Sequence, residues 1–315
     1  MLQRALRRCA EIQTIDPSRF AQDVASWRQP VVLRGVARDW PAVRAALGSD
    51  AALADYLGGF DRGALVEALV GPPAIRGRFF YDGARGLNFE RRRGGLGLVL
   101  STLLGLADDP DPPSVYVGST PIPPLLPGFE RANALALLPA DVVPRLWIGN
   151  ATTIQTHYDM SDNIACVVAG RRRFTLFPPD QVANLYPGPL EPTPGGQVVS
   201  LVDFDTPDFE QHPLFREAIA NAQVAELEPG DVLVYPALWW HQVEALEPFN
   251  VLVNYWWNAS PGFVDTPMNT LLHGLLSLRD RPDFEKQGWK VLFDYYLFGP
   301  ADRAGAHLPE AARGP

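Results

Sequence analysis

The second half of the chain is a succession of short apolar segments separated by turn residues. Segments of this kind, rich in β-branched and aromatic residues and bounded by Gly, Pro, Asp or Asn, are typical of strands. They predict strands over residues 146–149, 163–169, 173–177, 198–202, 231–235, 241–245 and 250–257. Closely spaced short strands fold as an antiparallel sandwich or barrel, which brings strands distant in sequence face to face. The expected fold is therefore mainly β with flanking helices.

The first third of the chain mixes strand and helix signals. Strands are predicted at residues 30–35, 79–81 and 114–117, and a buried helix at 96–106. Two further helices should begin after Asp39-Trp40-Pro41 and after Ser49-Asp50. The proline-rich stretch from Pro110 to Pro127 predicts an extended connection on the surface or over a pocket mouth. Residues 1–130 are thus expected to form an α/β cap wrapped on a core of residues 131–262.

The end of the chain is predicted to be helical. Thr266 can cap a helix whose first turn contains Pro267, and leucines follow at helical spacing. A second helix should run from about Pro282 to Phe298 and end at Gly299. The pair is more apolar than one packing face requires, so residues 263–315 are expected to form a homodimerising helical pair followed by a loose tail.

Composition limits the classes of protein to which the chain can belong. With 315 residues and 47% hydrophobic content it can bury a large core. The longest nearly apolar run, residues 96–107, is too short to cross a bilayer, and no signal-peptide pattern opens the chain. Cys9 and Cys166 form no disulfide framework. These features favour a cytoplasmic protein without a membrane segment, and the net charge of -9 argues against a nucleic-acid partner.

Three residues have the character of a metal site. His157 and Asp159 are two positions apart, which on a strand places both side chains on one face about 7 Å apart. His241 follows a predicted strand and turn, so it can face the first pair across a barrel. Two histidines and a carboxylate leave half of the coordination sphere of a metal ion open, as oxygen-activating non-haem Fe(II) requires. His212 lies in a polar loop, His273 among helical leucines and His307 in the tail, so they compete poorly for the metal.

An ordered series of motifs between Trp147 and Trp257 resembles the JmjC or cupin-like hydroxylases, and is similar to the asparaginyl hydroxylase that acts on the hypoxia-inducible factor. The matching segments are His157-Tyr158-Asp159, Asn163, residues 170–174, 176–181 and 185–189, Val202-Asp203-Phe204, Pro229-Gly230-Asp231, Trp239-Trp240-His241 and Asn254-Tyr255-Trp256. Residues 30–35 with 39–41 also resemble the opening of this family, and the two C-terminal helices resemble its dimerising pair.

The resemblance implies a double-stranded β-helix, or jelly roll, that binds Fe(II) through His157, Asp159 and His241. It also implies 2-oxoglutarate as co-substrate, with its far carboxylate held by a cation deep in the barrel. The family usually has a lysine there, and the matching residue is Arg172, which can donate two parallel hydrogen bonds. Tyr116 matches a tyrosine that reaches the same carboxylate.

Three further positions follow from the same resemblance. Asn163 and Asn254 match asparagines that line the end of the pocket near the iron. Ile154 stands where the family often has a threonine that donates to the co-substrate, and Thr153 or Thr156 are the candidates to replace that hydroxyl.

The implied reaction is hydroxylation of a C–H bond, with a protein or peptide side chain as the favoured substrate. Trp239 and Trp256 are the candidate substrate contacts at the barrel mouth, and a place in the core is the alternative for each. A small metabolite or peptide natural product is the alternative substrate class. Two other classes stay open, namely a cupin that uses Zn(II) or Mn(II) without oxygen chemistry, such as an isomerase, and a non-catalytic binding protein.

Overall fold

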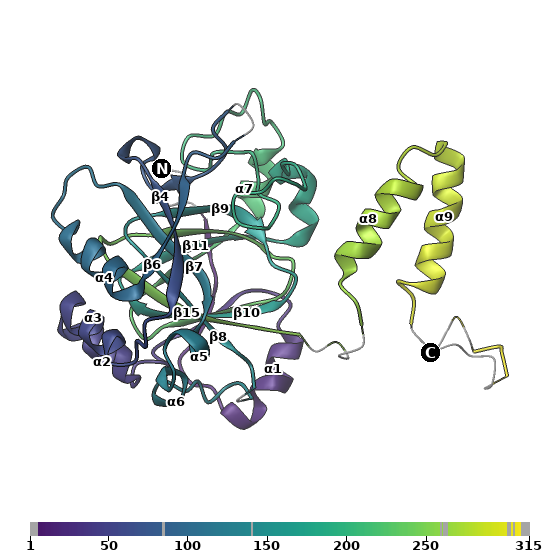
Figure 1. Cartoon of the computed structure of the whole chain (residues 1–315). Coiled ribbons are helices and arrows are strands. Elements are labelled where there is room, and N and C mark those ends of the chain that lie inside the picture. The colour runs from purple at the N-terminus through teal and green to yellow at the C-terminus, as the bar shows by residue number, and fades with distance from the viewer. Residues whose placement is uncertain are drawn as a thin grey trace. The chain divides into compact units, whose positions relative to one another are not determined.

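Strands from distant parts of the sequence assemble into two β-sheets in the computed structural model (Figure 1). It describes residues 6–83, 86–139, 141–258, 260, 264–300, 304 and 306–309. The six-stranded sheet has, in spatial order, β1 (Arg7–Arg8), β12 (Gln223–Leu227), β11 (Arg172–Phe177), β14 (Trp240–Ala245), β9 (Thr153–Tyr158) and β5 (Arg78–Phe79). The nine-stranded sheet has β2 (Ala10–Ile12), β3 (Val31–Leu33), β13 (Val232–Tyr235), β10 (Asp162–Ala169), β15 (Asn250–Trp257), β8 (Pro144–Gly149), β7 (Ser114–Pro121), β4 (Leu65–Gly71) and β6 (Glu90–Gly95).

Alternation along the strands explains how the two sheets share one core. On β10, Ala165 and Val167 join a buried cluster with Phe174 and Leu176 of β11, so these residues lie between the sheets. Their neighbours along β10, including Val168, point to the opposite face and join a second cluster with helical residues. The central pairings, β10 with β13 and β15 and β11 with β12 and β14, are antiparallel. The prediction of a jelly-roll core with flanking helices is confirmed.

Helices cover the outer face of the nine-stranded sheet. Figure 1 shows α2, α3 and α4 grouped on one side of the strands. Ser49 caps α3 as predicted, with its hydroxyl accepting a hydrogen bond of 3.0 Å from the Ala52 amide. The helices of this unit are α1 (Phe20–Ser26), α2 (Pro41–Gly48), α3 (Asp50–Gly58), α4 (Leu96–Gly105), α5 (Ile122–Leu125), α6 (Phe129–Ala132) and α7 (Phe215–Asn221), with 3-10 turns at Pro17–Arg19, Pro73–Ile75 and Pro179–Leu185.

The proline-rich stretch from Pro110 to Pro127 differs from its prediction. It contains β7, whose first half was predicted as a strand, followed by the short helix α5. Pro123 and Pro124 fall in the first turn of α5, where a missing N–H costs nothing. Ile122 and Leu125 then pack into the core. The stretch is therefore an integral part of the sheet and not a loose cover.

Residues 198–202 do not form the predicted strand. They make only isolated bridges, His157 with Val199 and Pro187 with Ser200. The reason is that their backbone bonds go to two different segments, from the Ser200 amide to Thr156 and from the Leu201 amide to Tyr186. The segment is rich in β-branched residues, but no single partner strand runs alongside it. The strand predicted at 79–81 is likewise shorter, since β5 ends at Phe79.

The chain divides into two compact units, residues 1–258 and residues 259–315. Strands of the first 130 residues join both sheets, and the subdivision of the first unit into cap and core stays a prediction. The second unit contains α8 (Pro267–Ser277) and α9 (Asp283–Tyr296), as predicted, with Thr266 capping α8. The predicted boundary at 262/263 and most of the predicted tail after Ala301 lie outside the described residues.

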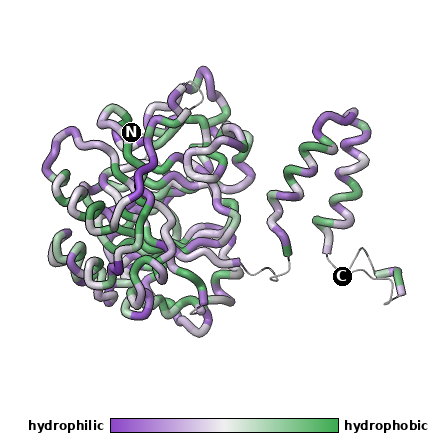
Figure 2. Tube along the Cα trace, in the orientation of Figure 1, coloured by the Kyte–Doolittle hydropathy of each residue, from purple (hydrophilic) through white to green (hydrophobic). Residues whose placement is uncertain are grey.

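The helices of the second unit bury none of their described side chains. Leu276 is 86% exposed and Phe284 80% exposed. Figure 2 shows hydrophobic residues along the strands of the first unit and a mixture of hydrophobic and hydrophilic residues along α8 and α9. Among the helices that the structure describes, none combines the length and apolar character needed to cross a membrane.

Candidate metal centre and adjoining cavities

The side chains of His157, Asp159 and His241 meet at the end of β9 where it pairs with β14. His157 and His241 are direct cross-strand partners, and their ring centroids are 4.3 Å apart. Asp159 directly follows β9, and one of its carboxylate oxygens, Oδ2, lies 3.6 Å from Nε2 of His241. One ligand atom from each of the three residues lies within 4.8 Å of the others. The structure therefore brings together the three residues that the sequence singled out, in a group able to hold one ion.

Both histidines are held in the tautomer that a metal requires. Nδ1 of His157 lies 2.8 Å from the carbonyl oxygen of Gln155, and Nδ1 of His241 lies 2.9 Å from that of Trp239. A carbonyl oxygen can only accept, so each Nδ1 carries the proton and donates. Each Nε2 then presents a lone pair, which is the form of imidazole that binds a metal.

His241 is also kept uncharged. It is only 2% exposed, and burial lowers its pKa to about 4, with the neighbouring His157 acting in the same direction. Asp159 and the Trp239 carbonyl oppose the shift but do not reverse it. At neutral pH the ring is therefore neutral and available as a ligand.

A relay of hydrogen bonds orients Asp159. Trp147 Nε1 donates to Asn254 Oδ1 at 2.6 Å, Asn254 donates to Asn163 Oδ1 at 3.2 Å, and Asn163 donates to Asp159 Oδ2 at 3.1 Å. Trp256 Nε1 donates to the same oxygen at 3.2 Å. The two asparagines that the sequence assigned to the pocket thus line it and also fix the rotamer of the carboxylate. Such outer partners set the affinity of a metal site.

An inner cavity of about 50 Å³ extends from the three ligands into the barrel. Its lining includes Tyr116 and Arg172 as well as the two asparagines. Arg172 is 3% exposed, and neither its Nε nor its Nη2 has a hydrogen-bond partner among the described residues. Burial lowers the pKa of Arg172 to about 10, which leaves the guanidinium charged at neutral pH.

The two unpartnered nitrogens of Arg172, Nε and Nη2, show whether a dicarboxylate co-substrate suits the cavity. A buried cation without a partner is costly, because its donors have lost water and gained nothing. A carboxylate placed beside Arg172 would satisfy these donors through charge-assisted hydrogen bonds. The same cavity is lined by the three metal ligands, so one molecule with a carboxylate at each end could contact both Arg172 and the metal. The residues present therefore suit a metal ion together with 2-oxoglutarate.

Ile154 lines the inner cavity at the position where the resemblance leads one to expect a threonine. Of the two hydroxyls proposed to replace that threonine, Thr156 donates to Gln242 at 3.3 Å instead. Thr153 is half-buried at the start of β9, and it is absent from the described lining of both cavities.

An outer cavity of about 240 Å³ is lined by His157 and Asp159, and its described lining does not include Arg172. Apolar side chains, among them Leu69, Phe79 and Trp256, form much of its wall, and an ion pair of 2.7 Å between Glu67 and Arg91 lies at its lining. Trp256 thus lies where a substrate contact was expected. Trp239 is instead buried in the core cluster between the sheets and is missing from the described lining of both cavities.

Three residues of the site were missed from the sequence. Tyr235 lines the inner cavity with its ring 4.8 Å from that of His241. Trp147 lines both cavities and starts the relay to Asp159. Gln155 offers the carbonyl that holds His157. Strand alternation could have placed Trp147 on the inner face. No local signal predicts that the ring of Tyr235 contacts His241 or that the carbonyl of Gln155 accepts from His157.

Comparison with known proteins adds a family and several relatives. The family described as a cupin-like domain matches residues 17–263. The lysine-specific demethylase JMJ31 of Arabidopsis thaliana is 31% identical over 135 residues, which are 42% of this chain and 23% of that protein. The tRNA wybutosine-synthesizing protein 5 of Gallus gallus is 42% identical over 106 residues, or 34% of this chain and 30% of that protein. HSPB1-associated protein 1 of Homo sapiens is 38% identical over 113 residues, or 35% and 22%. This chain therefore spans less than a third of the length of these relatives.

Proposed function

Because this chain belongs to the family of cupin-like domain proteins, we propose that it is an Fe(II)- and 2-oxoglutarate-dependent oxygenase that hydroxylates a C–H bond. The observation that carries the proposal is the charged guanidinium of Arg172, whose Nε and Nη2 are buried without hydrogen-bond partners, in the cavity that is also lined by His157, Asp159 and His241. A metal site alone would equally suit an isomerase. Arg172, a buried cation with two unpartnered donors beside that metal site, favours a co-substrate that carries both a keto acid and a second carboxylate.

Each group of the site has one task in this proposal. Fe(II) bound with 2-oxoglutarate would supply the oxidising chemistry. His157, Asp159 and His241 hold the ion, and the relay through Asn163 fixes the carboxylate. Arg172 would hold the far carboxylate of the co-substrate, and Tyr116, which is 5% exposed and lines both cavities, would reach the same carboxylate.

The substrate belongs in the outer cavity. That cavity shares His157, Asp159 and Ile154 with the inner one, so a side chain or small molecule entering it meets the metal ligands directly. Its lining is largely apolar with one ion pair, which suits an aliphatic or aromatic group carried on a polar chain. We propose a protein or peptide side chain as the substrate, with a small molecule as the alternative.

The test of the co-substrate needs no substrate. The apo-protein mixed with Fe(II) and 2-oxoglutarate in the absence of oxygen should develop the weak visible charge-transfer band of a chelated keto acid. Succinate, which lacks the keto group, is the control and should give no band. Bound Fe(II) without the band would overturn the proposal in favour of a non-oxygenase cupin, and no Fe(II) binding would favour a non-catalytic binding protein.

The substrate class has a separate test. Cell extract incubated with the protein, Fe(II) and 2-oxoglutarate should contain a peptide whose mass has risen by one oxygen atom. A sample with the co-substrate omitted is the control. Oxidation found only among small molecules would contradict a protein substrate and leave the proposed chemistry intact.

We expect the second unit to hold the protein as a homodimer. Leu276 and Phe284 are largely exposed on α8 and α9. Burying one such side chain stabilises the dimer by about 1.5–3 kcal/mol. In a two-fold interface each substitution is present in both subunits, so its effect is doubled. Leu276→Glu should therefore weaken dimerisation by more than about 100-fold, as measured by light scattering at decreasing concentration. Leu98→Glu, at a 66% exposed leucine of α4, is the matched control and should leave the dimer intact. A monomeric wild-type protein would contradict the expectation.

A further inference from the structure

The strand that carries His157 is irregular just before this residue. Across β9 and β14, His157 pairs with His241 and Ile154 pairs with Val243. Three steps along β9 therefore face two steps along β14, which is a β-bulge at Gln155 and Thr156. The extra residue is what lets both Ile154 and His157 face the cavities, since a regular strand would turn them to opposite faces.

The bulge interrupts the regular pairing of β9 with β14 at Gln155, and the carbonyl of this residue accepts the Nδ1 hydrogen of His157 at 2.8 Å. The direction of the carbonyl therefore depends on how Gln155 itself is held. The direction matters because it decides which nitrogen of His157 carries the proton.

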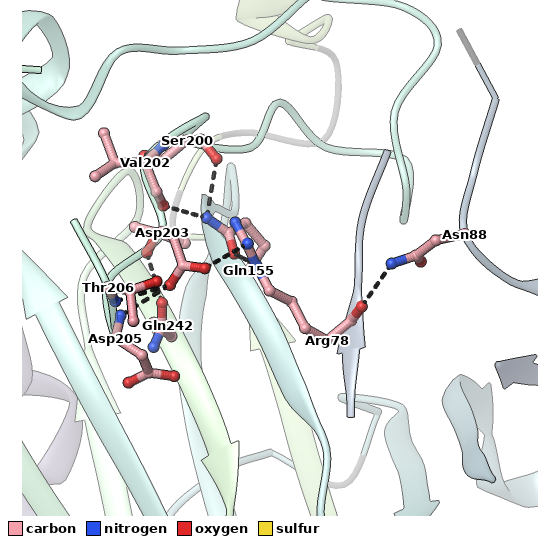
Figure 3. A network of polar contacts seen from close by, with 10 residues as sticks. Arg78, Asn88, Gln155, Ser200, Val202, Asp203, Asp205, Thr206 and Gln242 are labelled. Carbon is pink, nitrogen blue, oxygen red and sulfur yellow. Dashed lines mark hydrogen bonds and ion pairs between the residues drawn. The ribbon is translucent and has the colours of Figure 1, made fainter. Parts of the chain in front are cut away.

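The side chain of Gln155 is held by hydrogen bonds to other segments of the chain. It is 2% exposed, and its Nε2 donates to the carbonyls of Ser200 at 3.0 Å and Val202 at 2.7 Å. Its Oε1 accepts from Nε of Arg78 at 3.1 Å. Figure 3 shows the amide of Gln155 between these three partners. The carboxamide is thus tied to two other segments of the chain at once.

An ion pair braces the network from its outer side. Nη1 of Arg78 lies 2.7 Å from Oδ2 of Asp203, and Oδ1 of Asp203 accepts from the amides of Asp205 and Thr206 (Figure 3). The carbonyl of Arg78 accepts from Asn88 Nδ2 at 2.9 Å. Arg78 is therefore held by both its backbone and its guanidinium, and it presents Nε to Gln155.

We propose that Gln155 is a positioning residue for the metal ligand His157, with the Arg78–Asp203 ion pair as its brace. The carboxamide holds the bulge, the bulge aims the Gln155 carbonyl, and the carbonyl keeps the proton on Nδ1 so that Nε2 faces the metal. This role rests on the proposed metal site, but the tautomer of His157 can be measured without any metal.

The test compares Gln155→Leu with Asn133→Leu. Asn133 is a matched control because it is 1% exposed and its carboxamide also makes three hydrogen bonds, to the Ala42 amide, the Tyr56 hydroxyl and the Phe129 carbonyl, in the helical part of the core. Nitrogen NMR of the imidazoles in the apo-protein reports the tautomer of His157, and titration with Mn(II) reports metal affinity. Thermal unfolding of both variants reports the loss of stability that they share.

Gln155→Leu should convert His157 from one tautomer to a mixture and weaken Mn(II) binding about ten-fold, the usual size for a group that orients a ligand. Asn133→Leu should lower the unfolding temperature while leaving both readouts as in the wild-type protein. Equal changes in the two variants, or an unchanged His157 tautomer in Gln155→Leu, would overturn the inference. A wild-type protein that binds no Mn(II) would contradict the proposed metal site, while the tautomer comparison would still decide the role of Gln155.

A second pair of variants covers the case in which Gln155→Leu does not fold. Arg78→Met removes the Nε donor and the ion pair at a side chain that is 26% exposed. Arg34→Met is its control, since Arg34 is 22% exposed and pairs with Asp231 at 2.6 Å away from both cavities. Arg78→Met should shift the His157 tautomer and weaken Mn(II) binding, and Arg34→Met should do neither. If Arg78→Met and Arg34→Met behaved alike, both the role of the Arg78–Asp203 ion pair and the positioning role of Gln155 would be overturned.

Discussion

Asp159→Asn is expected to weaken Fe(II) binding by more than about 100-fold, because it removes about a third of the binding free energy that three ligands share. Asn163 and Trp256 both donate to Oδ2, so an amide oxygen must stay there to accept. This oxygen also lies beside Nε2 of His241, at 3.6 Å, but it is uncharged in the amide. The amide nitrogen replaces the second oxygen of the carboxylate and brings N–H groups, which cannot bind a cation.

Asp162→Asn is the matched control for this substitution. Asp162 is three residues away, and its Oδ1 accepts from the Ala237 amide at 2.9 Å, a bond that an amide oxygen can keep. Both variants lose one negative charge, so a general effect of charge on metal binding would appear in both. Titration with Mn(II) should leave the affinity of Asp162→Asn within about three-fold of the wild-type value. Similar affinities for Asp159→Asn and the wild-type protein would remove Asp159 from the ligand set.

Arg172→Met is expected to lose 2-oxoglutarate and to gain stability. Removing one partner of a buried ion pair costs about 3–5 kcal/mol, so the affinity for the co-substrate should fall by at least about 100-fold. In the absence of co-substrate the effect reverses, since Nε and Nη2 of Arg172 are buried without partners. Replacing this cation by an apolar side chain should raise the free energy of unfolding by about 1–3 kcal/mol. Denaturant unfolding of the apo-protein and the anaerobic charge-transfer band measure the two effects.

Arg173→Met separates the role of Arg172 from that of its neighbour. Arg173 points to the opposite face of β11, where it forms ion pairs with Glu226 at 2.9 Å and Glu244 at 3.4 Å. Its removal should lower stability by up to about 1 kcal/mol and leave the band unchanged. If Arg172→Met lost stability and kept the band, the guanidinium would be structural and the co-substrate would have another anchor.

The sequence predicts those parts of the protein that depend on local signals. The cap at Ser49, the proline in the first turn after Thr266 and the apolar run that forms β10 each act within a few residues, and each is found as expected. His157 and Asp159 were recognisable by their spacing, and His241 by the motif around it. These residues lie together because the jelly roll pairs β9 directly with β14.

What the sequence could not predict depends on segments far apart in the chain. A bulge is a mismatch between two strands, so Gln155 carries no sign of it alone. Residues 198–202 have the apolar, β-branched composition of a strand but bond to two separate segments. The missing partners of Arg172 are a property of everything packed around it, and the ring of Tyr235 reaches His241 only in the folded sheet pair. For Trp239 the sequence left both the barrel mouth and the core open, and the structure buries it in the core cluster between the sheets.

The two histidines are steadied by main-chain carbonyls of their own strand region, at Gln155 and Trp239. Every residue type carries such a carbonyl, so a point mutation at either position can loosen the bond but cannot delete its acceptor. A change in chain length is different. Deleting one residue of the bulge would force either Ile154 or His157 to turn away from the cavity. Over evolutionary time this metal centre should therefore be weakened by substitutions at these two positions and be inactivated chiefly by insertions and deletions between residues 154 and 157.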